Sequence, residues 1–77
     1  MRRAGEVTDV AQGVAIVRCP DEDHPDIGTP VLDESLEDVG RVVDVFGPVN
    51  SPFLAVTPDD GVRLPTLLGA ALYYRPD

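Results

Sequence analysis

The stretch VGRVVDVFGPVNSPFLAVTP (residues 39–58) decides the fold, because it holds two apolar runs on either side of a proline-containing break. Its first eight residues are rich in valine, and β-branched side chains of this kind favour a strand. Strict alternation along this strand would place Val43 and Val45 on the face opposite Val42. The second apolar run, FLAVT, is also a predicted strand, so the stretch describes two strands and their connection.

The connection between these strands, GPVNSP (residues 47–52), is longer than a hairpin requires. Two residues such as Asn-Gly are enough to reverse an antiparallel chain. Here Pro48 and Pro52 each fix φ and remove a backbone donor, and Val49 between them is apolar. We expect a stiff loop that loses little entropy on binding, which suits a protein interface. The alternative is that the prolines only shape a corner and the flanking phenylalanines are core side chains.

Short apolar runs bounded by turn residues recur along the whole chain, whereas no helical periodicity extends beyond one turn. This pattern predicts an all-β fold, a small six-stranded antiparallel closed barrel with little or no helix, because closure removes exposed sheet edges. The first and last strands are expected to meet, and one domain without tails is predicted over residues 3–75. The predicted strands are Gly5–Ala11, Val14–Arg18, Gly28–Glu34, Val39–Phe46, Phe53–Thr57 and Ala70–Arg75.

Glycine marks several of the connections between the strands. Gln12-Gly13 and Asp60-Gly61 are predicted tight turns, since glycine accepts a positive φ without strain. Residues 67–68 are expected to form at most one short helical turn, which Gly69 would end.

The charge balance of the chain is strongly acidic. Fourteen acidic residues compare with six arginines and no lysine, which gives a net charge of −8 at pH 7. This charge repels a phosphate backbone, and a direct nucleic-acid binder normally shows a basic patch beside aromatic residues. The composition argues against RNA or DNA as the main contact. It also suggests a proteome adapted to high salt, in which acidic surfaces stay hydrated.

The sequence carries no sign of a membrane-spanning or secreted protein. No apolar run approaches the roughly 20 residues of a membrane-spanning helix. The opening MRRAGEV has two arginines but no apolar region of the kind that secretory signals contain. We therefore predict a cytoplasmic protein with no membrane partner.

The ionisable residues do not form a recognisable catalytic or metal-binding constellation. His24 is the only histidine and lies in the acidic segment PDEDHPD, for which a solvated loop is the simpler interpretation. Cys19 is the only cysteine, which excludes an internal disulfide and suggests a small buried side chain. No serine has a triad partner, and the scattered glycines form no phosphate-binding loop. We predict no catalytic, cofactor-binding or metal-binding residue, no small-molecule substrate, and hence no enzyme.

Several segments of the chain resemble the Gar/Naf family, the small barrel subunit of H/ACA ribonucleoproteins, from about Arg3 to Arg75. GEVTDVAQGVAIVRC is similar to the family's opening strand, turn and strand, and LLGAALYYR to its closing segment. IGTPVLDESLEDVGRVVDVFGPVNSPFLAV resembles its central signature. The most specific part is FGPV (residues 46–49) followed by Pro52, because other small barrels share the Val-Gly-x-Val pattern.

The resemblance implies a barrel related to the second domain of translation elongation factors. It implies a non-catalytic subunit of the archaeal H/ACA guide-RNA complex that modifies rRNA, docked on the catalytic domain of the pseudouridine synthase. There the subunit would assist the loading and release of substrate RNA by acting on a mobile loop of the synthase. Guide and substrate RNA would be contacted only indirectly. The lack of Gly/Arg-rich tails, which eukaryotic members carry, and the missing lysines suggest a haloarchaeal source.

The residue pattern and the resemblance together predict one partner-binding surface between residues 39 and 56. Its basis is the stiff apolar loop, and an interface of roughly 800 Å² per partner would be ordinary for it. The predicted contact residues are Val42, Phe46, Gly47, Pro48, Val49, Pro52, Phe53 and Leu54.

Two other functions remain open from the sequence. A PRC-type barrel that serves as an adaptor in RNA processing or ribosome maturation also shows Gly-x-Val-x-Asp patterns, but it would not require the Gly-Pro-Val connector. A barrel that binds single-stranded RNA directly would need stacked aromatic side chains beside arginines. Tyr73, Tyr74 and Arg75 are the only cluster of this composition.

Overall fold

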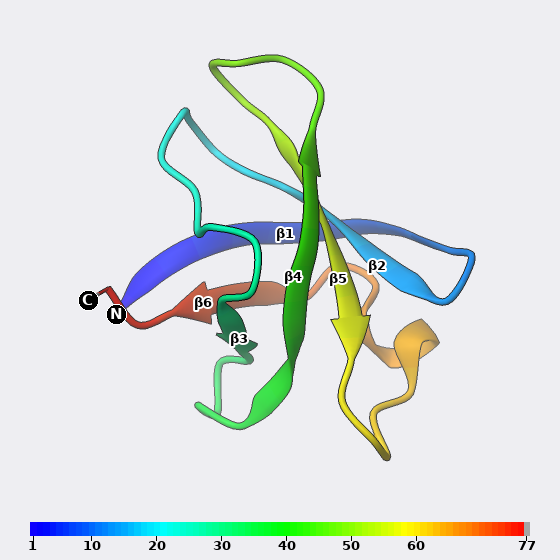
Figure 1. Cartoon of the computed structure of the whole chain (residues 1–77). Coiled ribbons are helices and arrows are strands. Elements are labelled where there is room, and N and C mark those ends of the chain that lie inside the picture. The colour runs from blue at the N-terminus through cyan, green and yellow to red at the C-terminus, as the bar shows by residue number, and fades with distance from the viewer. Residues whose placement is uncertain (77) are drawn as a thin grey trace.

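Six antiparallel strands close into a barrel in the computed structural model of the chain, which describes residues 1–76 (Figure 1). The strands follow one another around the barrel in the order β1-β2-β5-β4-β3-β6, so the first strand pairs with the last as expected. This confirms the predicted fold class. The elements are β1 (Arg2–Ala11), β2 (Val14–Arg18), β3 (Pro30–Leu32), β4 (Asp38–Phe46), β5 (Phe53–Pro58), the 3₁₀ helix η1 (Leu64–Leu67) and β6 (Ala71–Tyr74).

The bounds of β1 and β3 differ most from the sequence prediction, and those of the other four strands agree with it to within one residue at each end. Strand β1 starts at Arg2 rather than at Gly5, because its first two residues pair with β6. Strand β3 is only three residues long. It ends at Leu32, since the backbone and carboxylate of Asp33 bind the turn that follows, through Glu37 N at 3.1 Å among others.

The predicted turns are present at both glycine dipeptides. Gln12 and Gly13 have φ values of 53° and 79° and join β1 to β2. The single helical turn, η1, precedes residue 68 instead of including it, and Gly69 follows at φ 80°. In the described residues, no helix is long and apolar enough to cross a membrane.

The barrel interior is filled by small and medium apolar side chains from every strand. Each fully buried valine or leucine stabilises the fold by about 1.5–3 kcal/mol relative to an exposed one. The free thiol of Cys19 is buried among them, as predicted. The cluster consists of Ala4, Val7, Ala15, Val17, Cys19, Val31, Val39, Val42, Leu54, Val56, Leu67 and Leu72.

A β-bulge in β4 changes which of its side chains face inward. Val42 pairs with Val56 and Asp44 with Ala55, which leaves Val43 as the additional residue on the bulged strand. The bulge resets the alternation, so Val42 is buried and Val45 also packs against the core, whereas Val43 is exposed. The predicted placement of Val43 and Val45 on a shared face is therefore wrong.

Strands β4 and β5 approach each other closely near the start of β4, at Gly40. A β-carbon at Gly40 would clash with the carbonyl oxygen of Thr57 and lie 3.0 Å from a methyl carbon of Val56. Gly40 itself is buried and pairs with Pro58. Only glycine fits at this position, which explains why a valine-rich strand contains it.

Candidate protein-docking surface

The loop at residues 47–52 leaves β4 and returns to β5 over a pair of phenylalanines. Phe46 and Phe53 are register partners, and their rings stack with centroids 5.7 Å apart and planes inclined by 22°. Phe46 remains exposed while Phe53 is half-buried. The aromatic pair thus closes the base of the loop at one end of the barrel, at the top of Figure 1.

Backbone and hydroxyl hydrogen bonds tie the return of this loop to the end of β2. The Ser51 hydroxyl donates to the Cys19 carbonyl oxygen at 2.8 Å, and the Cys19 amide donates to the Pro52 carbonyl oxygen at 2.9 Å. The Ser51 amide donates to the Pro48 carbonyl oxygen at 3.3 Å. With two prolines and these three bonds the loop is held in one shape, and Val49 projects from its tip with 88% of its surface exposed.

The eight predicted contact residues divide by burial into two groups. Phe46, Gly47, Pro48 and Val49 are exposed, and Phe53 is half-buried beneath them. Pro52 is buried where the loop binds Cys19, and the side chains of Val42 and Leu54 have 0% exposure inside the barrel.

The burial of Val42 and Leu54 corrects the prediction that they contact a partner. The bulge and the register of β4 with β5 turn both side chains into the core, where they support the loop from below. Pro52 likewise acts on the shape of the loop, because it is buried against the end of β2.

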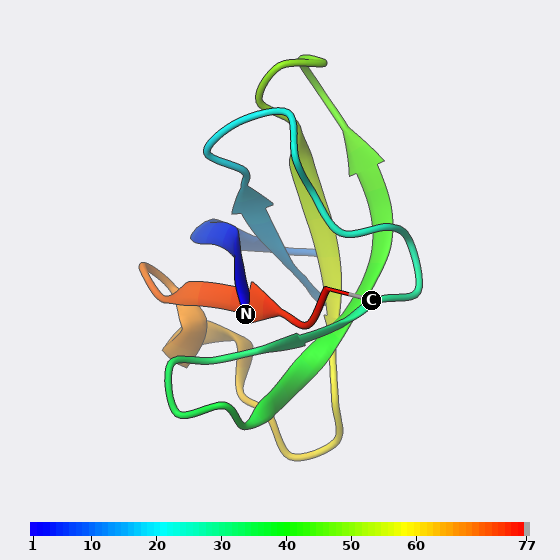
Figure 2. The ribbon, with the colours of Figure 1, turned by 90° about the vertical axis from the view of Figure 1, so that its left-hand side faces the viewer.

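Two exposed apolar residues that the sequence analysis did not select extend this surface. Val43 is 44% exposed at the bulge, and Ile27 is 62% exposed. The Gly28 amide donates to the Val42 carbonyl oxygen at 2.7 Å, and the Val42 amide donates to the Thr29 carbonyl oxygen at 3.0 Å. These bonds extend the β3–β4 pairing to residues 28–29, before the first residue of β3, so that the segment carrying Ile27 runs beside β4 (Figure 2).

We call the exposed set Ile27, Val43, Phe46, Gly47, Pro48 and Val49 the docking surface. No sequence signal identifies its first two members: a bulge has no fixed motif, and an isolated isoleucine next to an acidic loop resembles ordinary surface. The charges at its edge, Asp26 and Asp44, are both exposed and acidic. A complementary partner would therefore present an apolar centre with basic or neutral groups around it.

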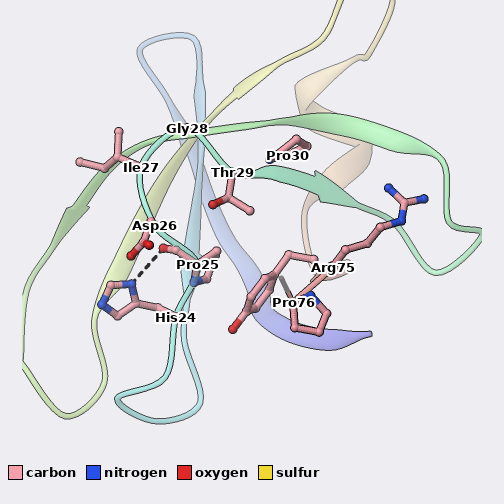
Figure 3. Close-up of a pocket in the computed structure, with 10 residues that line it drawn as sticks. His24, Pro25, Asp26, Ile27, Gly28, Thr29, Pro30, Arg75 and Pro76 are labelled. Carbon is pink, nitrogen blue, oxygen red and sulfur yellow. Dashed lines mark hydrogen bonds between the residues drawn. The ribbon is translucent and has the colours of Figure 1, made fainter.

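A hollow of about 550 Å³ lies beside the acidic loop (Figure 3). His24, Asp26, Thr29 and Arg75 contribute polar groups to it. The ring nitrogen Nδ1 of His24 is 2.9 Å from the Pro25 carbonyl oxygen, which satisfies that edge of the imidazole. Within residues 1–76 no group of three or more histidine, cysteine, aspartate or glutamate side chains is arranged to hold a metal ion.

The tyrosines and arginines near the two chain ends are brought together by β1 and β6. Tyr73 pairs with Arg3 and Tyr74 with Arg2, and both tyrosines are half-buried. Exposed arginines therefore surround the two tyrosines: Arg2 and Arg3 lie opposite them on β1, and Arg75 follows Tyr74 in the chain. The strand pairing thus adds Arg2 and Arg3 to the sequence-predicted group of Tyr73, Tyr74 and Arg75, and Arg2 lies 3.8 Å from an Asp23 carboxylate oxygen.

The fold and this surface define a small closed β-barrel with an exposed apolar loop at one end. The whole chain, residues 1–77, matches the family model described as the Gar1/Naf1 RNA binding region, and the chain belongs to this family. The resemblance inferred from FGPV and Pro52 is thereby confirmed. The family associates the chain with H/ACA ribonucleoproteins. No curated protein matches the sequence.

Proposed function

We propose that this chain is the non-catalytic barrel subunit of an archaeal H/ACA guide-RNA pseudouridylation complex, acting in the cytoplasm. It docks on the catalytic domain of the pseudouridine synthase and assists the loading and release of substrate RNA. The observation that carries the proposal is the rigid, exposed loop after Phe46 in a chain of this family. The loop combines apolar exposure with a fixed backbone, which lowers the entropy lost on binding.

The charge of the chain supports protein rather than RNA as the main contact. A net charge of −8 opposes the phosphate backbone, and the acids at the edge of the docking surface would favour a basic partner. A synthase that itself holds guide RNA needs basic surface to bind the phosphates of that RNA. The barrel would then influence substrate RNA through the synthase, without a cofactor and without chemistry of its own.

A pull-down with tagged chain and the synthase of the same organism, at native salt, tests the proposal. Val49→Asp places a charge at the centre of the contact and is expected to lower the retained synthase at least tenfold, about 1.4 kcal/mol. Pro48→Ala, which loosens the loop, should have a smaller effect in the same direction. Leu68→Asp is the matched control, since Leu68 is exposed but lies beyond η1. Unchanged retention of the synthase by folded Val49→Asp chain would refute the assignment.

Direct binding of single-stranded RNA is the second candidate function, because the family is described as an RNA binding region. The observation that favours it is the register that sets Arg3 against Tyr73 and Arg2 against Tyr74. Stacking on tyrosine beside arginine is the usual way to bind single strands. A gel shift with a labelled single-stranded oligoribonucleotide, in a salt series, separates the two functions. Retardation that disappears in an Arg2→Ala, Arg3→Ala variant would support direct binding.

The PRC-type adaptor gains no support from the family match. It also offers no reason for the rigid connector, whose prolines and stacked phenylalanines hold an apolar tip in solvent. The docking proposal accounts for that connector with one physical cause, which is pre-organisation for a partner.

A further inference from the structure

A hollow with an exposed leucine lies at the end of β4 opposite the docking surface, beside the turn that joins β3 to β4. The two turns at the ends of β4 are separated by the length of this nine-residue strand, about 26 Å at 3.3 Å per step (Figure 1). The hollow measures about 510 Å³ and is lined by Met1, Glu34, Leu36 and Tyr73. Leu36 is 55% exposed, and the Glu34 carboxylate is the only charged side chain in the lining.

The turn that presents Leu36 is rigid. An Asp33 carboxylate oxygen accepts hydrogen bonds from the amides of Ser35 at 2.8 Å and Glu37 at 3.1 Å. The Leu36 amide donates to the Asp33 carbonyl oxygen, and the Asp33 amide donates to the Glu37 carbonyl oxygen, both at 3.0 Å. Leu36 has φ 64°, a conformation that leucine rarely adopts. The hydrogen bonds of Asp33 thus fix the backbone conformation of the turn that carries Leu36.

The chemistry of the lining selects one kind of occupant. The aliphatic stem of a basic side chain packs on an apolar residue such as Leu36, and its cationic head is attracted to the face of a tyrosine ring. The Glu34 carboxylate then completes a charge-assisted hydrogen bond. An acidic or phosphate group would be repelled by Glu34, and an apolar side chain would form no charge-assisted hydrogen bond with this exposed carboxylate.

We propose that the hollow formed by Glu34, Leu36 and Tyr73 receives an arginine side chain of a partner protein. Arginine fits better than lysine because its planar guanidinium stacks on an aromatic ring while it donates to a carboxylate. The arginine of this chain that pairs with Tyr73, Arg3, does not take this place, because it lines a different hollow together with Arg18 and Glu6. The proposal does not depend on the docking of the synthase at the other end of β4.

Titration of the full ¹⁵N-labelled chain with a blocked peptide, acetyl-Gly-Arg-Gly-amide, tests this proposal by NMR. The control peptide carries citrulline, which has the shape of arginine without its charge. At the lowest salt that keeps the chain folded, the arginine peptide should shift the amides of residues 34–37 and Tyr73 in a saturable way. It should also bind at least fivefold more tightly than the citrulline peptide.

Matched variants separate a specific site from general attraction to an acidic protein. Glu34→Gln and Tyr73→Leu are each expected to weaken arginine-peptide binding at least threefold. Glu22→Gln removes the same charge from an exposed position in the acidic loop and should leave binding unchanged. Equal binding of the two peptides would overturn the proposal, as would equal losses in Glu34→Gln and Glu22→Gln. The amide spectrum of each variant verifies that it remains folded.

Discussion

Gly47 lies directly against the ring of Phe53: a β-carbon at Gly47 would come within 2.9 Å of the ring carbon Cδ2. Gly47 also has φ 90°, a backbone conformation that side chains disfavour. The first residue of the loop therefore has two independent reasons to be glycine. This relationship connects the loop, through the stacked phenylalanines, to the strand pair beneath it.

Replacement of Gly47 by alanine should destabilise the protein by about 2–4 kcal/mol, from positive-φ strain plus overpacking against Phe53. Gly61→Ala is the matched control, because Gly61 has φ 86° and a β-carbon there would meet nothing within 4 Å. The control should lose only the stability that the strained backbone at positive φ costs, about 1–2 kcal/mol. Denaturant unfolding of both variants gives the comparison, and equal losses would mean that the ring contact has no energetic consequence.

Val43→Asp is expected to weaken synthase binding about tenfold without unfolding the chain. Val43 is the exposed residue of the bulge, so the substitution removes apolar contact area and leaves the core intact. Its free energy of unfolding should change by no more than about 0.5 kcal/mol. Pull-down of the synthase measures the first effect and thermal unfolding the second. Normal binding by this variant would remove Val43 from the docking surface.

Leu54→Ala should behave in the opposite way to Val43→Asp. Leu54 is completely buried, so its truncation is expected to cost about 2–5 kcal/mol of stability. Under conditions in which the variant is folded, as verified by circular dichroism, its affinity for the synthase should match that of the wild type within about twofold, or 0.4 kcal/mol. A selective loss of binding by a folded variant would restore Leu54 as a contact residue.

The thiol of Cys19 should make stability fall at alkaline pH. Burial, and to a lesser degree the neighbouring Asp21 carboxylate, raises the pKa of Cys19 above its ordinary value of 9.0. The folded state then holds the thiol proton more tightly than the unfolded state does, so this stabilisation is complete below pH 9.0 and is lost as pH rises through the folded-state pKa. Unfolding curves across this range should decline less steeply for Cys19→Ala than for the wild type. Parallel curves would show that the thiol has the same pKa in both states.

Leu36→Asn should stabilise the chain by about 0.5–1 kcal/mol, because asparagine tolerates the left-handed conformation that Leu36 adopts at φ 64°. Leu36 is exposed, so the change removes little buried area. The same variant should lose affinity for the arginine peptide. Thermal unfolding measures the gain, and a decrease in stability would mean that Leu36 contributes packing that outweighs its strain.

The barrel could be predicted from the sequence because its signals are local. Valine-rich runs, glycine turns and the prolines of the 47–52 loop act through the conformations of their own residues, and all six strands were expected. The family was predicted for the same reason, since FGPV with Pro52 is a contiguous motif. The exposure of Val49 also follows from local stiffness, because an apolar residue between two fixed prolines has little freedom to fold back.

The composition of the two surfaces was decided only by the tertiary structure. A one-residue bulge, set by the pairing of β4 with β5, turned Val42 inward and Val43 outward, and no local preference encodes that register. Ile27 lies near β4 because its neighbours Gly28 and Thr29 are hydrogen-bonded to Val42, and Leu36 and Tyr73 line one hollow because β3 pairs with β6. Such contacts depend on closure of the whole barrel, in which every strand's register is fixed by both neighbours.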